Sequence, residues 1–238
     1  MKLYRILITS TTASFRYPNL ITSNQLSIKA VPYTTIAGLI ASAVGKYMND
    51  FNFSYTFRYL SKFVDLETIY KFAKKGESVD NKNVVSDRFK REILFDCYLS
   101  LYVDSKEIAD AFKEPIFQLL LGRSSDIAKV VEVKEIEAIK TDKAMLNGTI
   151  VPFNEYKSFG EIYSLPRCFD YSEIVRKPQK VEPFLINDGI GNFVYKPLNT
   201  KEKFDLKNWK FKKMLNVIET TAYLDEELNT PILLRKLC

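Results

Sequence analysis

The first half of the chain switches between strand-like and helix-like hydrophobic patterns. Apolar and polar positions alternate over residues 2–9 (KLYRILIT), which predicts a strand. In residues 34–48 the apolar positions recur every three or four residues, which predicts a helix with Thr34 or Thr35 as its N-cap. Residues 11–33 contain two prolines and no period, so they predict a long loop between these elements.

Further strands and one short helix follow. Residues 57–73 suggest one strand or a bent pair. Residues 74–92 are polar with a turn-prone DNKN at 80–83, which predicts a protruding hairpin or a mobile loop. Ser105 is a plausible cap for a helix that ends before Pro115. The remaining strands are expected at residues 93–103, 116–122 and 129–139. The resulting order, β-α-β-(hairpin)-β-α-β, is that of the split βαβ, ferredoxin-like fold and of RNA-recognition motifs.

Helical periodicity fades after about residue 140, and short apolar runs separated by Pro and Gly take its place. The sequence therefore predicts an α+β protein of two parts. Residues 1–140 form a ferredoxin-like domain with a hairpin insertion at about 74–92, and residues 141–238 form a smaller β-rich extension.

Composition narrows the class of protein. The chain has 238 residues and 46 % hydrophobic residues, enough for a sizeable core. No apolar run is long enough for a membrane span, and the N-terminus lacks the features of a secretory signal. Three widely spaced cysteines suggest neither a disulfide framework nor a metal site, so we expect a cytoplasmic protein. The net charge of +6 favours an anionic partner, although a merely soluble basic protein would share it.

The absence of histidine excludes several kinds of chemistry. A Ser-His-Asp triad, a Cys-His dyad and a histidine-based metal site are impossible in this chain. It also lacks the glycine-rich motifs that bind nucleoside triphosphates and dinucleotides. We therefore expect no metal and no cofactor, and any catalysis must use Lys, Tyr, Arg or carboxylate side chains.

Two short motifs could contact an anion, and each has a simpler interpretation. In LLLGRSS, Gly122 would let a backbone approach a phosphate and Arg123 would pair with it, but a β-turn with a surface arginine would look the same. RFKREI brings together Arg88, Lys90 and Arg91, which would equally suit a solvated strand edge. The lysine-rich residues 201–213 are interpreted as a solvated face.

Four motifs, taken in order, resemble one family. They are TASFRYP (12–18), P-x-T-T-I-x-G-L-I-x-S-A-x-G (32–45), KREILFDC (90–97) and PIFQLLLGRS (115–124). This series is similar to the CRISPR-associated protein 5 family, whose members are subunits of type I surveillance (Cascade) complexes. The resemblance covers about the first 125 residues. It implies a RAMP-type ferredoxin-like domain with a β-hairpin thumb and a variable β-rich C-terminal part.

The resemblance also implies a function. Family members cap one end of the complex, bind the 5′ repeat-derived handle of the CRISPR RNA, contact the large subunit and the backbone subunit, and reach target DNA through the complex. Arg16 would be the main cation and Ser14 a hydroxyl donor, whereas Phe15 would pack inward and Tyr17 would either stack or pack. Further RNA contacts are expected from Lys46, Arg88, Lys90, Arg91, Gly122 and Arg123.

Two other functions stay open. One subfamily is an endoribonuclease that needs Tyr, Lys and His, and the lack of histidine here favours a non-catalytic subunit. The alternative is a metal-independent endoribonuclease that uses, for example, Tyr47 with Lys46. A third possibility is a purely structural subunit that holds neighbouring proteins and barely touches RNA.

Overall fold

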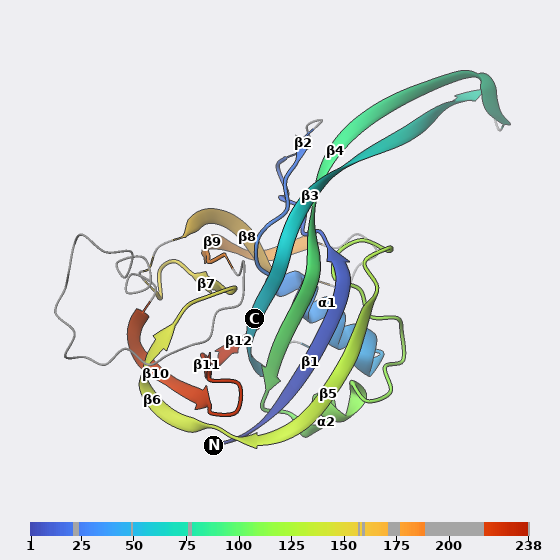
Figure 1. Cartoon of the computed structure of the whole chain (residues 1–238). Coiled ribbons are helices and arrows are strands. Elements are labelled where there is room, and N and C mark those ends of the chain that lie inside the picture. Colours follow the sequence, from blue (N-terminus) through green and yellow to red (C-terminus); the bar gives the residue numbers. More distant parts are fainter. Residues whose placement is uncertain are drawn as a thin grey trace.

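A computed structural model provides the structure of the chain. It describes residues 1–20, 24–48, 50–75, 78–156, 158, 160–170, 177–188 and 217–237. These residues are mostly in strands, and a curled central sheet dominates the molecule (Figure 1). Neither helix in the described segments has the length and apolar character that a membrane span requires.

The central sheet has six strands, five of them in the order β12-β3-β4-β1-β5, with β2 paired to β4. Strand β4 lies between β1 and β3, and all neighbours along the five-stranded path are antiparallel. The strand bounds are β1 Lys2–Ala13, β2 Asn24–Gln25, β3 Asn52–Lys75, β4 Ser78–Val103, β5 Ala128–Glu137 and β12 Arg235–Lys236. The predicted strands at 2–9, 93–103 and 129–139 are therefore confirmed, the first two as parts of longer strands.

Both helices of the described segments pack on one face of this sheet. Helix α1, Tyr33–Val44, buries an apolar stripe and ends at Gly45, whose φ of 83° is accessible to glycine at little cost. It begins earlier than predicted, because the Pro32 carbonyl accepts the first helical hydrogen bonds. The N-cap prediction at Thr34 or Thr35 is thus wrong. Helix α2, Lys106–Ala111, confirms its prediction, since the Ser105 hydroxyl accepts the Ile108 N–H at 3.4 Å.

The apolar run at 116–122 does not form the predicted strand. Only Leu120 makes an isolated bridge, to Ile127. Two backbone N–H groups of the run instead donate to carbonyls in the last turn of α1, Ile116 to Ala43 at 3.2 Å and Phe117 to Ser42 at 2.9 Å. These bonds satisfy carbonyls that have no hydrogen-bond partner within the helix. The segment therefore caps the C-terminal end of α1 and does not extend the sheet.

Strands β3 and β4 form one long hairpin that projects far beyond the body of the sheet (Figure 1). The antiparallel register runs from the pair Phe53 and Val103 at the base to the pair Lys75 and Ser78 near the tip. A protruding hairpin is therefore present, but its first arm is the whole of β3. The predicted turn at 80–83 is wrong, because these residues belong to β4. We refer to the projecting part, from about residue 61 to residue 95, as the thumb.

The C-terminal part builds two small sheets, with strand orders β11-β10-β6 and β7-β9-β8. Their bounds are β6 Ile139–Met145, β7 Ile150–Pro152, β8 Glu161–Asp170, β9 Lys177–Ile186, β10 Val217–Asp225 and β11 Thr230–Ile232. The suggested boundary at residue 140 falls just inside β6, and side chains from both parts share the main core.

The apolar run at 191–197 and the lysine-rich residues 201–213 lie outside the described residues. Cys168 takes part in a disulfide, contrary to what the odd cysteine count suggested.

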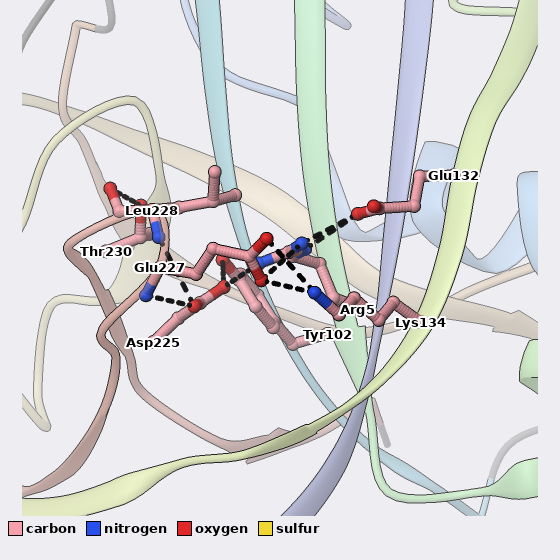
Figure 2. A network of polar contacts seen from close by, with 8 residues as sticks. All are labelled: Arg5, Tyr102, Glu132, Lys134, Asp225, Glu227, Leu228 and Thr230. Carbon is pink, nitrogen blue, oxygen red and sulfur yellow. Dashed lines mark hydrogen bonds and ion pairs between the residues drawn. The ribbon is translucent and has the colours of Figure 1, made fainter.

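A buried polar network ties the C-terminal part to the helix-free face of the sheet (Figure 2). Arg5 of β1 is only 1 % exposed, and its guanidinium contacts the Asp225 carboxylate at 2.8 Å and the Glu132 carboxylate at 2.7 Å. Asp225 also accepts the Tyr102 hydroxyl at 3.0 Å and the backbone N–H of Glu227 at 3.1 Å. The turn between β10 and β11 is thereby held against the sheet.

Candidate nucleic-acid interface

Segments that are far apart in the sequence meet around one cavity of about 420 Å³. Its lining comes from the loop after β1, from the start of α1, from the Gly122–Arg123 turn, from Arg91 in the thumb and from β8. We call it the arginine pocket. Each of the four motifs that carry the family resemblance contributes at least one residue to its wall.

Arg16 is the exposed cation of this pocket. Its backbone bridges to Ser27, and the side chains on either side, Phe15 and Tyr17, are buried. Phe15 packs edge-on against Phe57 at 5.4 Å between ring centroids, which confirms its inward position. Among the described residues, no carboxylate forms an ion pair with Arg16. The alternation of buried and exposed side chains in this loop therefore presents one unneutralised guanidinium to solvent.

Tyr17 packs inward rather than toward the pocket. Its side chain is 6 % exposed, and its hydroxyl donates to the Glu161 carboxylate at 2.7 Å. The ring lies edge-on to Tyr163 at 4.7 Å. Burial, together with the hydrogen bond to Glu161, raises the pKa of the Tyr17 phenol. In this position the ring presents no open face on which a base could stack.

Ser14 and Gly122 lie together because their backbones approach very closely. A Cβ atom at position 122 would be 2.2 Å from the Ser14 carbonyl oxygen, and the φ of Gly122 is +117°. The Ser14 hydroxyl is used internally, since it donates to the Glu92 carbonyl at 3.2 Å. Gly122 therefore allows two loops to pack against each other at the edge of the pocket.

Arg123 and Arg91 line the pocket, but both are held by carboxylates. Glu67 in β3 accepts two hydrogen bonds from Arg91 at 2.8 Å and one from Arg123 at 2.9 Å. Asp126, which is fully buried, accepts Arg123 Nη2 at 2.9 Å and the Thr12 hydroxyl at 2.6 Å. The two hydrogen bonds from Arg91, followed by the one from Arg123, hold the pKa of Glu67 below its usual value.

The charges around the pocket nearly balance. Three arginines, Arg16, Arg91 and Arg123, face the two carboxylates Glu67 and Asp126, which leaves one positive charge. The start of α1 adds a partial positive charge, because Pro32, Thr34 and Thr35 at this helix end line the pocket and the first turn contains no acidic residue to offset the helix dipole. An anion would therefore be attracted mainly by Arg16 and the helix start.

The thumb separates the three cations that the sequence placed together. Arg88 is paired with Thr68 and Lys90 with Leu66, and both cations are exposed on one face of the hairpin. Arg91 is one residue further along β4 and points to the opposite face, where Glu67 holds it. Among the described residues, neither Arg88 nor Lys90 forms an ion pair, but both lie on the face of the hairpin opposite to Arg91 and neither lines the pocket.

Lys46 is not part of this cluster. It follows the C-terminal end of α1, whereas the pocket lies at the N-terminal end, roughly 18 Å away for twelve helical residues. Its ammonium group lies 3.6 Å from the Glu107 carboxylate. Within the described segments, no three acidic, cysteine or histidine side chains are close enough together to hold a metal ion.

Sequence reasoning missed the two carboxylates that hold Arg91 and Arg123. Glu67 stands in a run that predicts only a strand, and its link to Arg91 depends on the register of the hairpin. Asp126 follows Arg123 at a distance of three residues within one turn. That spacing was a readable signal for a local salt bridge, whereas the role of Glu67 was not visible.

No protein-family model matches the chain, and no curated protein sequence matches it either. Among solved structures, it resembles a chain of a CRISPR RNA-guided surveillance complex, with a TM-score of 0.44 and 20 % identity over 55 % of this chain. That match spans 61 % of the other chain, less than two thirds of its length.

Two further solved structures match almost the whole chain. One belongs to the type III-B Cmr-beta complex bound to cognate target RNA and AMPPnP, with a TM-score of 0.48, 14 % identity, and coverage of 98 % and 99 % of the two chains. The other is a CRISPR protein from Archaeoglobus fulgidus, with a TM-score of 0.43, 11 % identity, and coverage of 99 % and 100 %. All three TM-scores are below 0.5, so these likenesses decide neither fold class nor function.

Proposed function

We propose that this protein is a non-catalytic RNA-binding subunit of a type I CRISPR effector complex, of the CRISPR-associated protein 5 kind. In this role it binds and caps the 5′ repeat-derived handle of the CRISPR RNA in the cytoplasm. It contacts the large and backbone subunits and thereby serves antiviral defence. Target DNA is reached only through the assembled complex.

One observation carries this proposal. Four motifs spread over more than a hundred residues converge on the arginine pocket, and Arg16, from the first motif, is its one cation without a carboxylate partner among the described residues. A pocket that combines a free guanidinium with a helix N-terminus suits a phosphate group. The exposed cations Arg88 and Lys90, on the opposite face of the thumb from Arg91, would give an RNA backbone further contacts outside the pocket.

The topology supports the fold that the proposal requires. The elements β1, α1, β3, β4, α2 and β5 follow one another as β-α-β-β-α-β, with sheet order β3-β4-β1-β5. We assign this arrangement to the ferredoxin-like class of RAMP domains, with β3 and β4 extended into the thumb.

The test is binding of a labelled repeat-derived RNA over a series of salt concentrations. Each phosphate contact on a single strand contributes about 0.7 to the slope of log K against log salt. Replacing Arg16 by Ala should weaken binding and lower this slope by about 0.7, whereas Arg16→Lys should keep most of the slope. Lys2→Ala is the matched control, because Lys2 is an exposed cation at the opposite end of β1. Equal affinity and slope for Arg16→Ala and the wild type would refute the proposed site.

The lack of catalysis is tested in the same samples. The repeat RNA is incubated with the protein in EDTA and examined for a defined cleavage product. We expect none. A discrete product that disappears in Tyr47→Phe would instead favour the metal-independent endoribonuclease.

A further inference from the structure

The helix-free face of the central sheet contains a second cavity, of about 480 Å³. Its floor is formed by Leu7 and Thr9 of β1, Arg58 of β3, and Tyr98 and Ser100 of β4. These side chains alternate along their strands with residues of the main core, which pack under the helices. The cavity, which we call the open-face pocket, therefore lies on the opposite side of the sheet from that core.

Arg58 is the cation of this pocket, which the Asp96 carboxylate also lines. It is only partly exposed, and no carboxylate of the described residues forms an ion pair with it. Burial lowers the pKa of the Arg58 guanidinium below its ordinary value. Moving a charge out of water without a partner is unfavourable, and a bound anion would remove that cost.

Tyr98 provides an aromatic surface directly beside this cation. It is the cross-strand partner of Arg58 in the β3–β4 register, and it is 49 % exposed. The Asp96 carboxylate, which lines the same pocket, raises the pKa of the Tyr98 phenol. The Tyr98 ring remains partly open to solvent. Aromatic side chains on an open sheet face can stack unpaired bases.

The wall of the open-face pocket comes from the C-terminal part of the chain. Leu228 and Thr230 line it: Leu228 lies in the turn that the Arg5 network holds, and Thr230 begins β11 just after that turn (Figure 2). The Asp225 carboxylate accepts the Leu228 N–H at 3.3 Å, and the Thr230 hydroxyl donates to the Leu228 carbonyl at 3.2 Å. The pocket is thus built on residues whose positions are fixed by buried contacts.

We propose that the open-face pocket holds one unpaired nucleotide of the bound RNA, with its base on the Tyr98 ring and its phosphate at Arg58. This inference rests on the proposed function, and it adds a base-contacting site that the arginine pocket lacks. A volume of about 480 Å³ lies in the range of small-molecule pockets and admits a single nucleotide. The unpaired guanidinium favours this occupant over an uncharged apolar segment of a partner protein.

Binding of single-stranded RNA across a salt series tests the proposal. Tyr98→Ala should weaken binding by about 5- to 100-fold with an unchanged salt slope, because stacking involves no counterion release. Tyr98→Phe, which keeps the ring, should bind like the wild type. Arg58→Gln should lower the slope by about 0.7. Phe117→Ala removes an exposed aromatic ring that lines neither pocket and serves as the control.

The outcomes separate this inference from the proposed function. If Arg16→Ala weakens RNA binding while Tyr98→Ala and Arg58→Gln bind normally, the arginine pocket stands and the open-face pocket is refuted. If the wild type binds no RNA, the proposed function fails. Equilibrium dialysis with AMP then tests nucleotide binding in the open-face pocket without RNA. AMP binding by the wild type that is lost in Tyr98→Ala supports the pocket as a nucleotide site. Absence of AMP binding by the wild type refutes it. Thermal denaturation of each variant verifies that it is folded.

Discussion

Replacing Arg123 by Ala should destabilise the fold more than it weakens RNA binding. The sequence motif presents Arg123 as a phosphate contact, but the structure surrounds it with the Asp126 and Glu67 carboxylates, each at 2.9 Å. Asp126 is 0 % exposed. Without the guanidinium, it would keep only the Thr12 hydroxyl at 2.6 Å and the backbone N–H of residue 123 at 3.0 Å.

The size of the effect follows from these contacts. Removing one partner of a fully buried ion pair costs about 3–5 kcal/mol. Two features reduce that figure here, since the Arg123 side chain is 22 % exposed and Asp126 keeps two hydrogen bonds. We expect a loss of about 2–3 kcal/mol, which lowers the melting temperature of a chain of this size by roughly 4–12 °C.

Thermal denaturation of a double-mutant cycle measures this coupling. Arg123→Ala, Asp126→Asn and the double variant are melted at neutral pH. The loss of stability in the double variant should be smaller than the sum of the losses in the two single variants. The reason is that burying an amide without a partner costs less free energy than burying a carboxylate without a partner. The reasoning is refuted if Arg123→Ala melts like the wild type while its RNA-binding salt slope falls by about 0.7. That result would make Arg123 a phosphate contact.

Three further predictions concern other positions. Asp225→Ala should cost about 2–4 kcal/mol of stability, because it removes the buried carboxylate that pairs with the buried Arg5. Glu227→Ala removes an exposed carboxylate and should leave the melting temperature nearly unchanged; similar losses for the two variants in thermal melts would contradict this. Gly122→Ala should cost about 2 kcal/mol, because its Cβ would meet the Ser14 carbonyl, and a wild-type melting curve would show that the loops can separate. The depressed pKa of Glu67 contributes stability that is present above its unfolded value of about 4.5 and is lost as the pH falls through the folded value. Glu67→Gln should therefore flatten the melting temperature between about pH 5 and pH 3, and an unchanged slope would exclude Glu67 as the source.

Local sequence signals predicted those elements whose stabilising contacts are close in the chain. The Ser105 cap and Pro115 bracket α2, and the apolar stripe of α1 follows from its own periodicity. The register of the long β3–β4 hairpin could not be predicted from local signals, because it depends on where the chain turns. A turn at 80–83 shifts every pairing of β3 with β4, and such a shift moves side chains to other partners or to the other face.

The candidate site shows the same division between local and distant information. The motifs located the pocket, since Arg16, Gly122 and Arg123 do line it together. They could not indicate which cation is free, because this depends on carboxylates delivered by other elements. Glu67 reaches Arg91 and Arg123 only through the hairpin register and the packing of the Gly122 loop. Charge counted along the sequence therefore overstates the charge available to a ligand.

The C-terminal part contributes a wall to both pockets. Leu165, Pro166 and Phe169 of β8 close the arginine pocket, and Leu228 with Thr230 closes the open-face pocket. Each cavity therefore lies where the two parts of the chain meet, on opposite sides of the central sheet. The C-terminal part also adds β12 to the edge of that sheet, so it cannot separate from the N-terminal part without exposing shared core. The family motifs end near residue 125, yet the shapes of both pockets depend on residues beyond that point. A strand-rich extension that varies in sequence would thus alter the fit of a ligand while the motif residues stay in place.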